Sequence, residues 1–223
     1  MPQPRYALYY VPGADDPLLS AGNHWLGRDP ETGATLPQPP GLATLTEAPR
    51  RYGFHATLRP PFALGDGQTL AQFHAACACI LAAHRPFPLP PLAVGQLDGF
   101  LALLPTAPCP PLHAVADALV LGLNRFRPPL SPAARARRRP ETLSPQQTEN
   151  LDRFGYPDML ATWRFHLTLS HRLPTPAPHW LRQAETHFAL SLAQPRQLTD
   201  IALFAEPARG ANFTQLARIP LIS

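Results

Sequence analysis

Two copies of the sequence Phe-His-x-Thr-Leu carry the clearest chemical signal in this chain. The first copy contains His55 and Thr57, and the second contains His166 and Thr168 at the same spacing. Side chains alternate between the two faces of an extended strand, so each histidine shares a face with its threonine. Each copy therefore predicts a strand with an apolar face toward a core and a His/Thr face opposite. Two such strands facing each other would gather two imidazoles and two hydroxyls around one cleft.

Two histidines across a cleft suit acid–base catalysis at phosphorus. One imidazole takes a proton from the attacking water or hydroxyl, and the other gives a proton to the leaving oxygen. A hydroxyl on the same face can donate a hydrogen bond to a non-bridging phosphoryl oxygen. Arg59 and Arg172 follow the two motifs and could add charge-assisted contacts, with solvated surface arginine as the alternative for both. For either histidine alone, the alternative is a strand histidine that is hydrogen-bonded at the rim of a core.

Other kinds of site have less support in the sequence. Neither motif contains Asp or Glu, so the motifs predict no metal site, and no cofactor is expected. No Gly-x-Ser-x-Gly sequence and no phosphate-binding glycine loop are present. Cys77, Cys79 and Cys109 have neither zinc-site nor redox-motif spacing, and we expect buried thiols in a reducing cytoplasm.

Composition indicates a globular, cytoplasmic protein. The chain has 223 residues, of which 45% are hydrophobic, but it has no signal-peptide pattern and no apolar stretch of membrane-spanning length. Its 19 basic residues are all Arg, and the net charge of +4 favours anionic ligands. A nucleic-acid partner is less favoured, because the arginine cluster Arg135–Arg139 lacks interleaved aromatic residues. The positive charge of this loop could still guide anions toward a cleft.

Helical and strand-like segments alternate along the chain. Apolar periodicity and turn residues predict helices over 17–26, 69–84, 112–126, 145–154 and 179–187, and strands over 6–11, 51–61, 87–94, 99–104, 163–173, 198–204 and 213–219. A long irregular loop is expected over 27–49. This order predicts an α+β class with antiparallel sheets. We expect a single bilobal domain with lobes over 1–105 and 106–223, each containing one His-x-Thr motif.

The motifs and several further segments resemble one known superfamily. These segments are Trp25–Asp29, Arg51–Leu58, Gly99–Leu103, Arg127–Ser131 and Arg164–Leu169. With them, the chain resembles the two-histidine (2H) phosphoesterases, and within these the branch found beside carbon–phosphorus lyase genes and linked to phosphonate metabolism. The resemblance implies a duplicated, bilobal fold of two antiparallel sheets around a central cleft, with helices outside.

The resemblance also implies roles for the motif residues. His55 and His166 become the acid–base pair of a metal-independent phosphodiesterase, and Thr57 and Thr168 become phosphate-binding hydroxyls. Tyr52, inside the first motif, is a further candidate for substrate contact. The chain departs from its relatives just after the second motif, where it has Ser170-His171.

The predicted function is hydrolysis of a small, cyclic phosphodiester of the ribose or nucleotide type, in phosphonate catabolism. An RNA-end or oligonucleotide phosphodiesterase uses the same chemistry and is the first alternative. A non-catalytic nucleotide- or phosphonate-binding protein is the alternative from another class. Matched His-x-Thr pairs argue against that last alternative, because a pure binder needs no acid and base.

Overall fold

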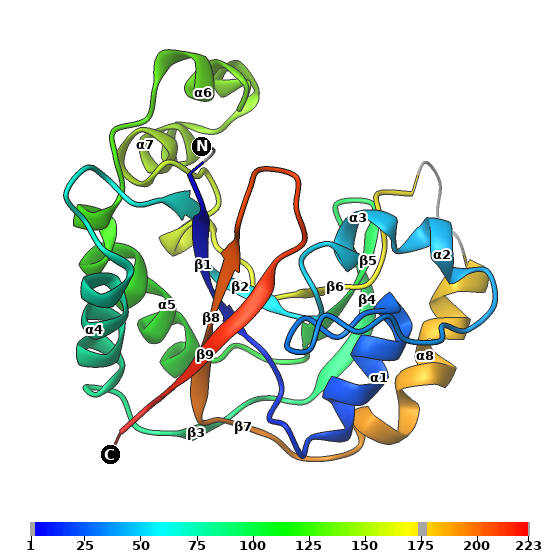
Figure 1. Ribbon diagram of the computed structural model, residues 1–223. Helices are drawn as coiled ribbons and strands as arrows, with labels where there is room; N and C mark the ends of the chain where they lie inside the picture. The colour runs from blue at the N-terminus through cyan, green and yellow to red at the C-terminus, as the bar shows by residue number, and fades with distance from the viewer. Residues whose placement is uncertain (1–2, 174–177, 223) are drawn as a thin grey trace.

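A computed structural model describes residues 3–173 and 178–222 as an α+β fold built on one antiparallel sheet (Figure 1). Its strand order is β4–β5–β6–β2–β1–β8–β9. A separate pair is formed by β3 and β7. The strands are β1 (Arg5–Tyr10), β2 (Ala56–Ala63), β3 (Phe87–Pro88), β4 (Leu92–Leu97), β5 (Phe100–Pro105), β6 (Leu167–Thr168), β7 (Gln197–Leu198), β8 (Asp200–Glu206) and β9 (Thr214–Pro220).

Helices cover the face of the sheet that carries the main core. Trp25 of α1, Phe73 of α4, Leu112 of α5 and Phe188 of α8 are buried in one cluster with Leu8 of β1. In Figure 1, α4 and α5 lie at the left of the view, and α1 and α8 lie at the right. The helices are α1 (Pro17–Leu26), α2 (Leu42–Leu45), α3 (Glu47–Arg50), α4 (Leu70–Leu81), α5 (Pro110–Gly122), α6 (Pro132–Ala136), α7 (Pro145–Phe154) and α8 (Pro178–Leu192), with 3-10 turns η1 (Asn124–Phe126), η2 (Pro140–Thr142) and η3 (Leu160–Thr162).

The predicted helices begin and end at side chains that satisfy their terminal backbone groups. Asp16 accepts a hydrogen bond from the Leu18 amide at 2.8 Å before α1, and Thr69 and Ser144 form capping boxes before α4 and α7. Gly155 ends α7 with a φ of 79°. These local signals explain why the helices expected over 17–26, 69–84 and 145–154 are found as α1, α4 and α7. The loop expected over 27–49 differs, because it contains the short helices α2 and α3.

The α+β class and the antiparallel pairing are confirmed, but the division of the chain differs from the expectation. β1 of the first half pairs with β2 and also with β8 of the second half, which pairs in turn with β9. Likewise, β6 of the second half pairs with β5 of the first. The two strand groups meet at the single pair Ala56↔Leu167, so they form one continuous sheet instead of two. Antiparallel ladders can join strands that are distant in sequence, so lobes over 1–105 and 106–223 do not describe this fold.

The second motif strand is shorter than expected. Only Leu167–Thr168 forms β6, although a strand was expected over 163–173. The backbone amides of the residues that follow donate hydrogen bonds to two different parts of the chain. The Leu169 and Leu173 amides donate to carbonyls of the β4–β5 hairpin, at 2.8 and 2.6 Å, whereas the His171 amide donates to Leu45 of α2 at 2.8 Å. This split removes the regular ladder that a longer strand requires.

The cysteines and the helix lengths bear on two further expectations from the sequence. Cys77 and Cys109 are buried, but Cys79 is exposed, because residues two apart on α4 point to different sides of the helix. Within the described residues, no helix is long and apolar enough to cross a membrane. The cytoplasmic location stays a prediction.

Candidate active site

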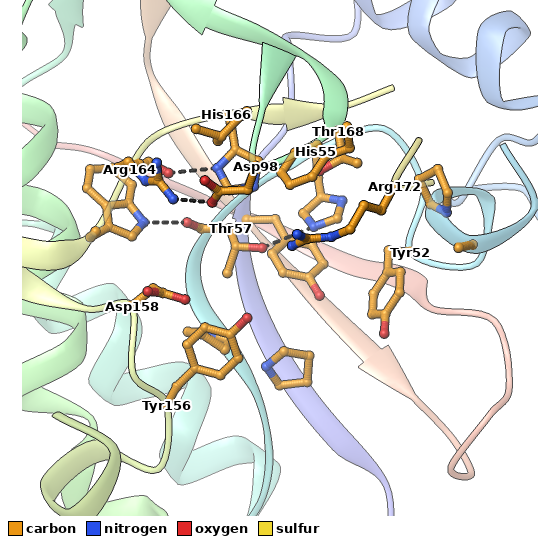
Figure 2. A pocket seen from close by; sticks show the side chains of 18 of the residues that line it. Tyr52, His55, Thr57, Asp98, Tyr156, Asp158, Arg164, His166, Thr168 and Arg172 are labelled. Carbon is orange, nitrogen blue, oxygen red and sulfur yellow. Dashed lines mark hydrogen bonds and ion pairs between the residues drawn. The ribbon is translucent and has the colours of Figure 1, made fainter. Parts of the chain in front are cut away.

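A cavity of about 510 Å³ brings the two motifs together (Figure 2). His55 and Thr57 line it from the start of β2, and His166 and Thr168 line it from β6 and the residue before it. The alternate residues of both motifs are buried in the main core: Phe54, Ala56, Leu58, Phe165, Leu167 and Leu169. The predicted separation of a His/Thr face from an apolar face is therefore present in both motifs.

Both imidazoles are oriented by the same local hydrogen bond. His55 Nδ1 lies 2.9 Å from the Gly53 carbonyl oxygen, and His166 Nδ1 lies 2.8 Å from the Arg164 carbonyl oxygen. A carbonyl oxygen only accepts hydrogen bonds, so each Nδ1 carries a proton and each neutral ring has Nε2 as its acceptor. Thr57 Oγ1 lies 3.2 Å from His55 Nε2, so this hydroxyl donates to Nε2 in the free protein. The arrangement leaves Nε2 of each histidine as its proton-exchanging atom.

The first of these hydrogen bonds depends on a glycine. Gly53 has a φ of 81°, in the left-handed region that other residues rarely adopt. A Cβ atom at this position would lie 2.8 Å from the Pro30 side chain, which is closer than packed atoms come. Gly53 thus lets the chain turn tightly enough for its own carbonyl to meet His55.

Burial makes both histidines weak bases. Desolvation lowers the pKa of His55 from 6.5 to about 4, and the nearby His166 lowers it further, while the hydrogen bond to Gly53 opposes the shift. Desolvation also lowers the pKa of His166, again opposed by its backbone hydrogen bond. Both imidazoles are consequently neutral at pH 7 in the free protein.

The lowered pKa of His55 predicts a loss of stability in acid. Between pH 6.5 and pH 4, the unfolded chain binds a proton at this histidine and the folded chain does not, so stability falls as the pH falls through this window. Allowing for the partial exposure of the ring, we expect His55 to account for about 2 kcal/mol of the loss. Urea unfolding at pH 7 and pH 4.5 measures it. His55→Gln should show a smaller loss than the unaltered protein, and equal losses would contradict the prediction.

The cavity carries more positive than negative side chains. Four guanidinium groups line it against two carboxylates: Arg5, Arg138, Arg164 and Arg172 against Asp98 and Asp158. Asp98 forms an ion pair with Arg164, and Asp158 accepts a hydrogen bond from Gln147 at 2.8 Å. The balance favours an anionic ligand.

Of the three residues expected to contact substrate, Tyr52 and Arg172 line the cavity and Arg59 does not. Ser170 also lines it, but its hydroxyl accepts from the Leu101 amide at 2.9 Å and donates to the His171 carbonyl at 2.7 Å. Ser170 therefore has a structural role beside the second motif.

A β-bulge explains the position of Arg59. Tyr9 pairs with Thr57 but Leu8 pairs with Arg59, so Leu58 is an extra residue in β2. One extra residue moves the side chains that follow it to the opposite face of the sheet. Arg59 is accordingly 1% exposed. On the core side of the sheet, its guanidinium donates a hydrogen bond to the Phe154 carbonyl oxygen at 3.4 Å. The structure removes Arg59 from the candidate site.

Several cavity residues were not anticipated from the sequence. Tyr9 of β1 packs its ring against His55, with 3.8 Å between ring centroids, and Phe100 of β5 packs near His166 at 5.5 Å. Trp163 donates its indole N–H to the Thr57 carbonyl at 2.8 Å, which links the second motif to the first. All three are aromatic residues inside apolar segments, and such residues usually belong to a core, so no sequence signal distinguishes them.

The arginine cluster contributes to the cavity through one member. Arg138 lines the cavity, and its guanidinium lies 4.6 Å from the centre of the Tyr156 ring, which lines it too. Arg135 instead pairs with Asp152 at 2.6 Å on the surface. The cluster thus spans the end of α6 and the residues after it, and it places Arg138 at the cavity.

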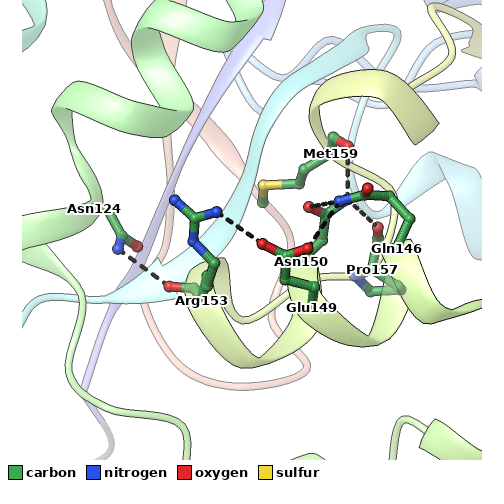
Figure 3. A network of polar contacts seen from close by, with 7 residues as sticks. All are labelled: Asn124, Gln146, Glu149, Asn150, Arg153, Pro157 and Met159. Atoms are coloured by element: carbon green, nitrogen blue, oxygen red, sulfur yellow. Dashed lines mark hydrogen bonds and ion pairs between the residues drawn. The ribbon is translucent and has the colours of Figure 1, made fainter.

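Helix α7 holds the wall of the cavity that contains Tyr156 and Asp158 (Figure 3). Asn150, which is buried, donates to the Pro157 carbonyl at 3.1 Å and to the Met159 carbonyl at 2.8 Å. These bonds satisfy backbone acceptors in a segment without regular structure. They fix the position of a loop that lies far in sequence from the first motif.

The chain matches a known protein family and two curated relatives. The sequence profile of the family DUF1045, described as "Protein of unknown function", matches residues 57–214. A protein from Janthinobacterium sp. (strain Marseille) is 35% identical over 97% of this chain, and one from Laribacter hongkongensis (strain HLHK9) is 36% identical over 94%. Both are named ribose 1,5-bisphosphate phosphokinase PhnN. The matches cover 50% of each, so this chain spans about half the length of these relatives.

Solved structures show weaker similarity. Escherichia coli LigT complexed with 3′-AMP is 17% identical with a TM-score of 0.48, and both chains are covered completely. Usb1 of Kluyveromyces marxianus with uridine monophosphate is 11% identical with a TM-score of 0.39, over 96% of this chain and 99% of Usb1. At these TM-scores, the likeness carries no weight for this chain's function.

The family match covers more than half of the chain, including Thr57 and the whole second motif. The resemblance drawn from the motifs agrees with this match and with the PhnN name of the relatives. The chain belongs to the DUF1045 family, and it carries the paired His-x-Thr motifs by which it resembles the 2H phosphoesterases.

Proposed function

We propose that this protein is a phosphodiesterase that hydrolyses a small cyclic phosphodiester of the ribose or nucleotide type, using His55 and His166 as general base and general acid. The observation that carries the proposal is the convergence of both His/Thr pairs on one cavity with a positive balance of charge. The two imidazoles are close enough for the charge of His166 to affect the pKa of His55. A cavity of about 510 Å³ is of a size that takes one small ligand.

The neutral state of His55 suggests its role. Desolvation lowers the pKa of His55 to about 4, so at pH 7 its Nε2 is free of a proton and suits the base. His55 Nε2 takes a proton from water as the water oxygen bonds to phosphorus. The bond from phosphorus to the leaving oxygen breaks, and His166 Nε2 gives its proton to that oxygen. The products are a phosphomonoester with a free hydroxyl, and proton exchange with solvent restores both histidines.

The threonines stabilise the charge that develops on the phosphoryl group. Thr57 has a single hydroxyl proton, which it donates to His55 Nε2 in the free protein. When that hydroxyl turns to a non-bridging oxygen, Nε2 becomes free to accept the proton of water. Thr168 supplies the matching donor from β6. Donors placed in advance toward such oxygens favour the transition state.

The proposed reaction requires no metal ion. Neither motif contains a carboxylate, and the two carboxylates at the cavity already have partners in Arg164 and Gln147. Binding of an anionic substrate would raise the pKa of His166. His166 would then carry on Nε2 the proton that it gives to the leaving oxygen.

The substrate class rests partly on the relatives. Their printed name refers to a ribose bisphosphate, which fits a ribose-type phosphodiester and a role in phosphonate catabolism. The kinase activity in that name has no support here, since a phosphate-binding kinase loop uses a lysine and this chain contains none.

The proposal is tested by turnover on a panel of ribose and nucleoside cyclic phosphates and an oligonucleotide that ends in a cyclic phosphate, in excess EDTA, with His55→Ala alongside. We expect turnover that survives the chelator and is lost in the variant. The best panel member would define the substrate class, and preference for oligonucleotide ends would favour the RNA-type alternative. Activity lost to EDTA alone would contradict the metal-free mechanism. Binding without turnover at any pH would favour a non-catalytic binding protein.

A further inference from the structure

Tyr9 lies at the centre of the candidate site, although neither motif contains it. In the ladder between β1 and β2 its Cα partner is Thr57, so the two side chains lie on the same face of the sheet. Its ring centroid is 3.8 Å from that of His55, with 30° between the ring planes. Tyr9 is 1% exposed and lines the cavity.

The Tyr9 ring is held rigidly. Phe204 of β8 lies 5.0 Å from it and Phe213 lies 6.2 Å from it, both measured between centroids. Together with Ala7, Val11 and Ala202, these residues form a small apolar cluster on the cavity face of the sheet. Phenylalanine would satisfy the packing of such a cluster equally well. The hydroxyl therefore needs a separate explanation.

The Tyr9 hydroxyl opens into the cavity. It forms no hydrogen bond within the part of the chain that the structure describes. It is also not one of the fully buried polar atoms without a hydrogen-bond partner, so the hydroxyl itself is accessible from the cavity. The charged and polar groups that act on it include Tyr52, Arg5 and Tyr156, all of which line the cavity. Burial raises its pKa well above 10, so the group is an O–H donor at every working pH. A buried tyrosine hydroxyl normally has a partner, and here only the cavity can supply one.

We propose that Tyr9 is a ligand-contacting residue whose hydroxyl donates a hydrogen bond to an anionic oxygen of the phosphoryl group bound between the two motifs. It is the third hydroxyl donor after Thr57 and Thr168. The ring contact with His55 places this donor on the base side of the cavity. The inference deepens the proposed function and rests on it for the reaction, but phosphate binding tests it independently of turnover.

The test compares Tyr9→Phe with Tyr10→Phe. Tyr10 is the next residue of β1, is 2% exposed, and belongs to the main core on the opposite face, where it packs near Phe165 at 5.5 Å. The same hydroxyl is thus removed from each face of one strand. Binding of inorganic phosphate is measured by titration calorimetry, and turnover is measured on the best cyclic phosphate of the panel.

Loss of a hydrogen bond to an anionic oxygen should weaken phosphate binding and lower kcat/KM by about 10- to 100-fold in Tyr9→Phe. The pH profile should keep its shape, because the ring beside His55 is retained. Tyr10→Phe should bind phosphate and turn over substrate like the unaltered protein. Equal phosphate affinity in Tyr9→Phe and the unaltered protein would overturn the role of Tyr9 while leaving the proposed function intact. Failure of the unaltered protein both to bind phosphate and to turn over substrate would overturn both proposals.

Discussion

Replacing either His55 or His166 by alanine is expected to lower kcat by about a hundredfold or more. Each side chain supplies one proton transfer that no neighbour can supply in its place. Among the described residues, His55 and His166 are the two imidazoles that line the cavity. The measurement is steady-state turnover of the preferred cyclic phosphate at saturating concentration. Because the two residues act in one step, the double variant should lose little more than each single variant.

His171→Ala is the matched control for these variants. His171 lies five residues after His166, but it does not line the cavity, and its Nδ1 lies 3.1 Å from the Thr44 carbonyl oxygen. Its removal should leave kcat within about a factor of two, because a surface contact of this kind contributes little. A rate equal to that of the unaltered protein in His55→Ala or His166→Ala would remove that histidine from the mechanism.

Replacing the buried Glu206 by alanine is expected to destabilise the fold more than removal of an exposed carboxylate. Its carboxylate is fully buried at the end of β8, where it accepts from Arg5 at 2.5 Å, Arg51 at 3.3 Å and the Gly210 amide at 2.8 Å. Truncation leaves two guanidinium groups and an amide without this partner. Since both arginines are partly exposed, water can compensate in part, and we expect a loss of about 3 kcal/mol. The free energy of unfolding in urea measures it.

Asp152→Ala is the comparison for Glu206→Ala. Asp152 also pairs with an arginine, Arg135, at 2.6 Å, but both side chains are exposed. Exposed ion pairs contribute little to stability, so this variant should unfold like the unaltered protein. Similar stabilities in Asp152→Ala and Glu206→Ala would show that burial of Glu206 has no special effect.

Local features of the sequence were sufficient for the longer helices and for the faces of the motif strands. Asp16 with Pro17, and Ser144 with Gly155, define helix ends through hydrogen bonds that span only a few residues. Strand alternation is equally local, because it depends only on backbone geometry. For that reason His55 and Thr57 could be assigned to one face without knowledge of the fold.

The same local reasoning failed for Arg59. Alternation continued from His55 and Thr57 would put Arg59 on the cavity face. The bulge at Leu58 reverses this, and a bulge is defined by the partner strand β1, which lies far away in sequence. A feature made by two strands cannot be read from one of them.

The sequence by itself determined the longer helices, the family resemblance, and the residue types that the proposed chemistry needs. Only the tertiary structure decided that both His/Thr pairs share one cavity, that the halves of the chain form one sheet, and that Tyr9, Trp163 and Arg138 belong beside the motifs. The physical reason is how far apart in the sequence the interacting residues lie. Caps and alternation act over a few residues, whereas a cavity is formed by side chains from distant segments whose positions depend on long-range strand pairing and burial.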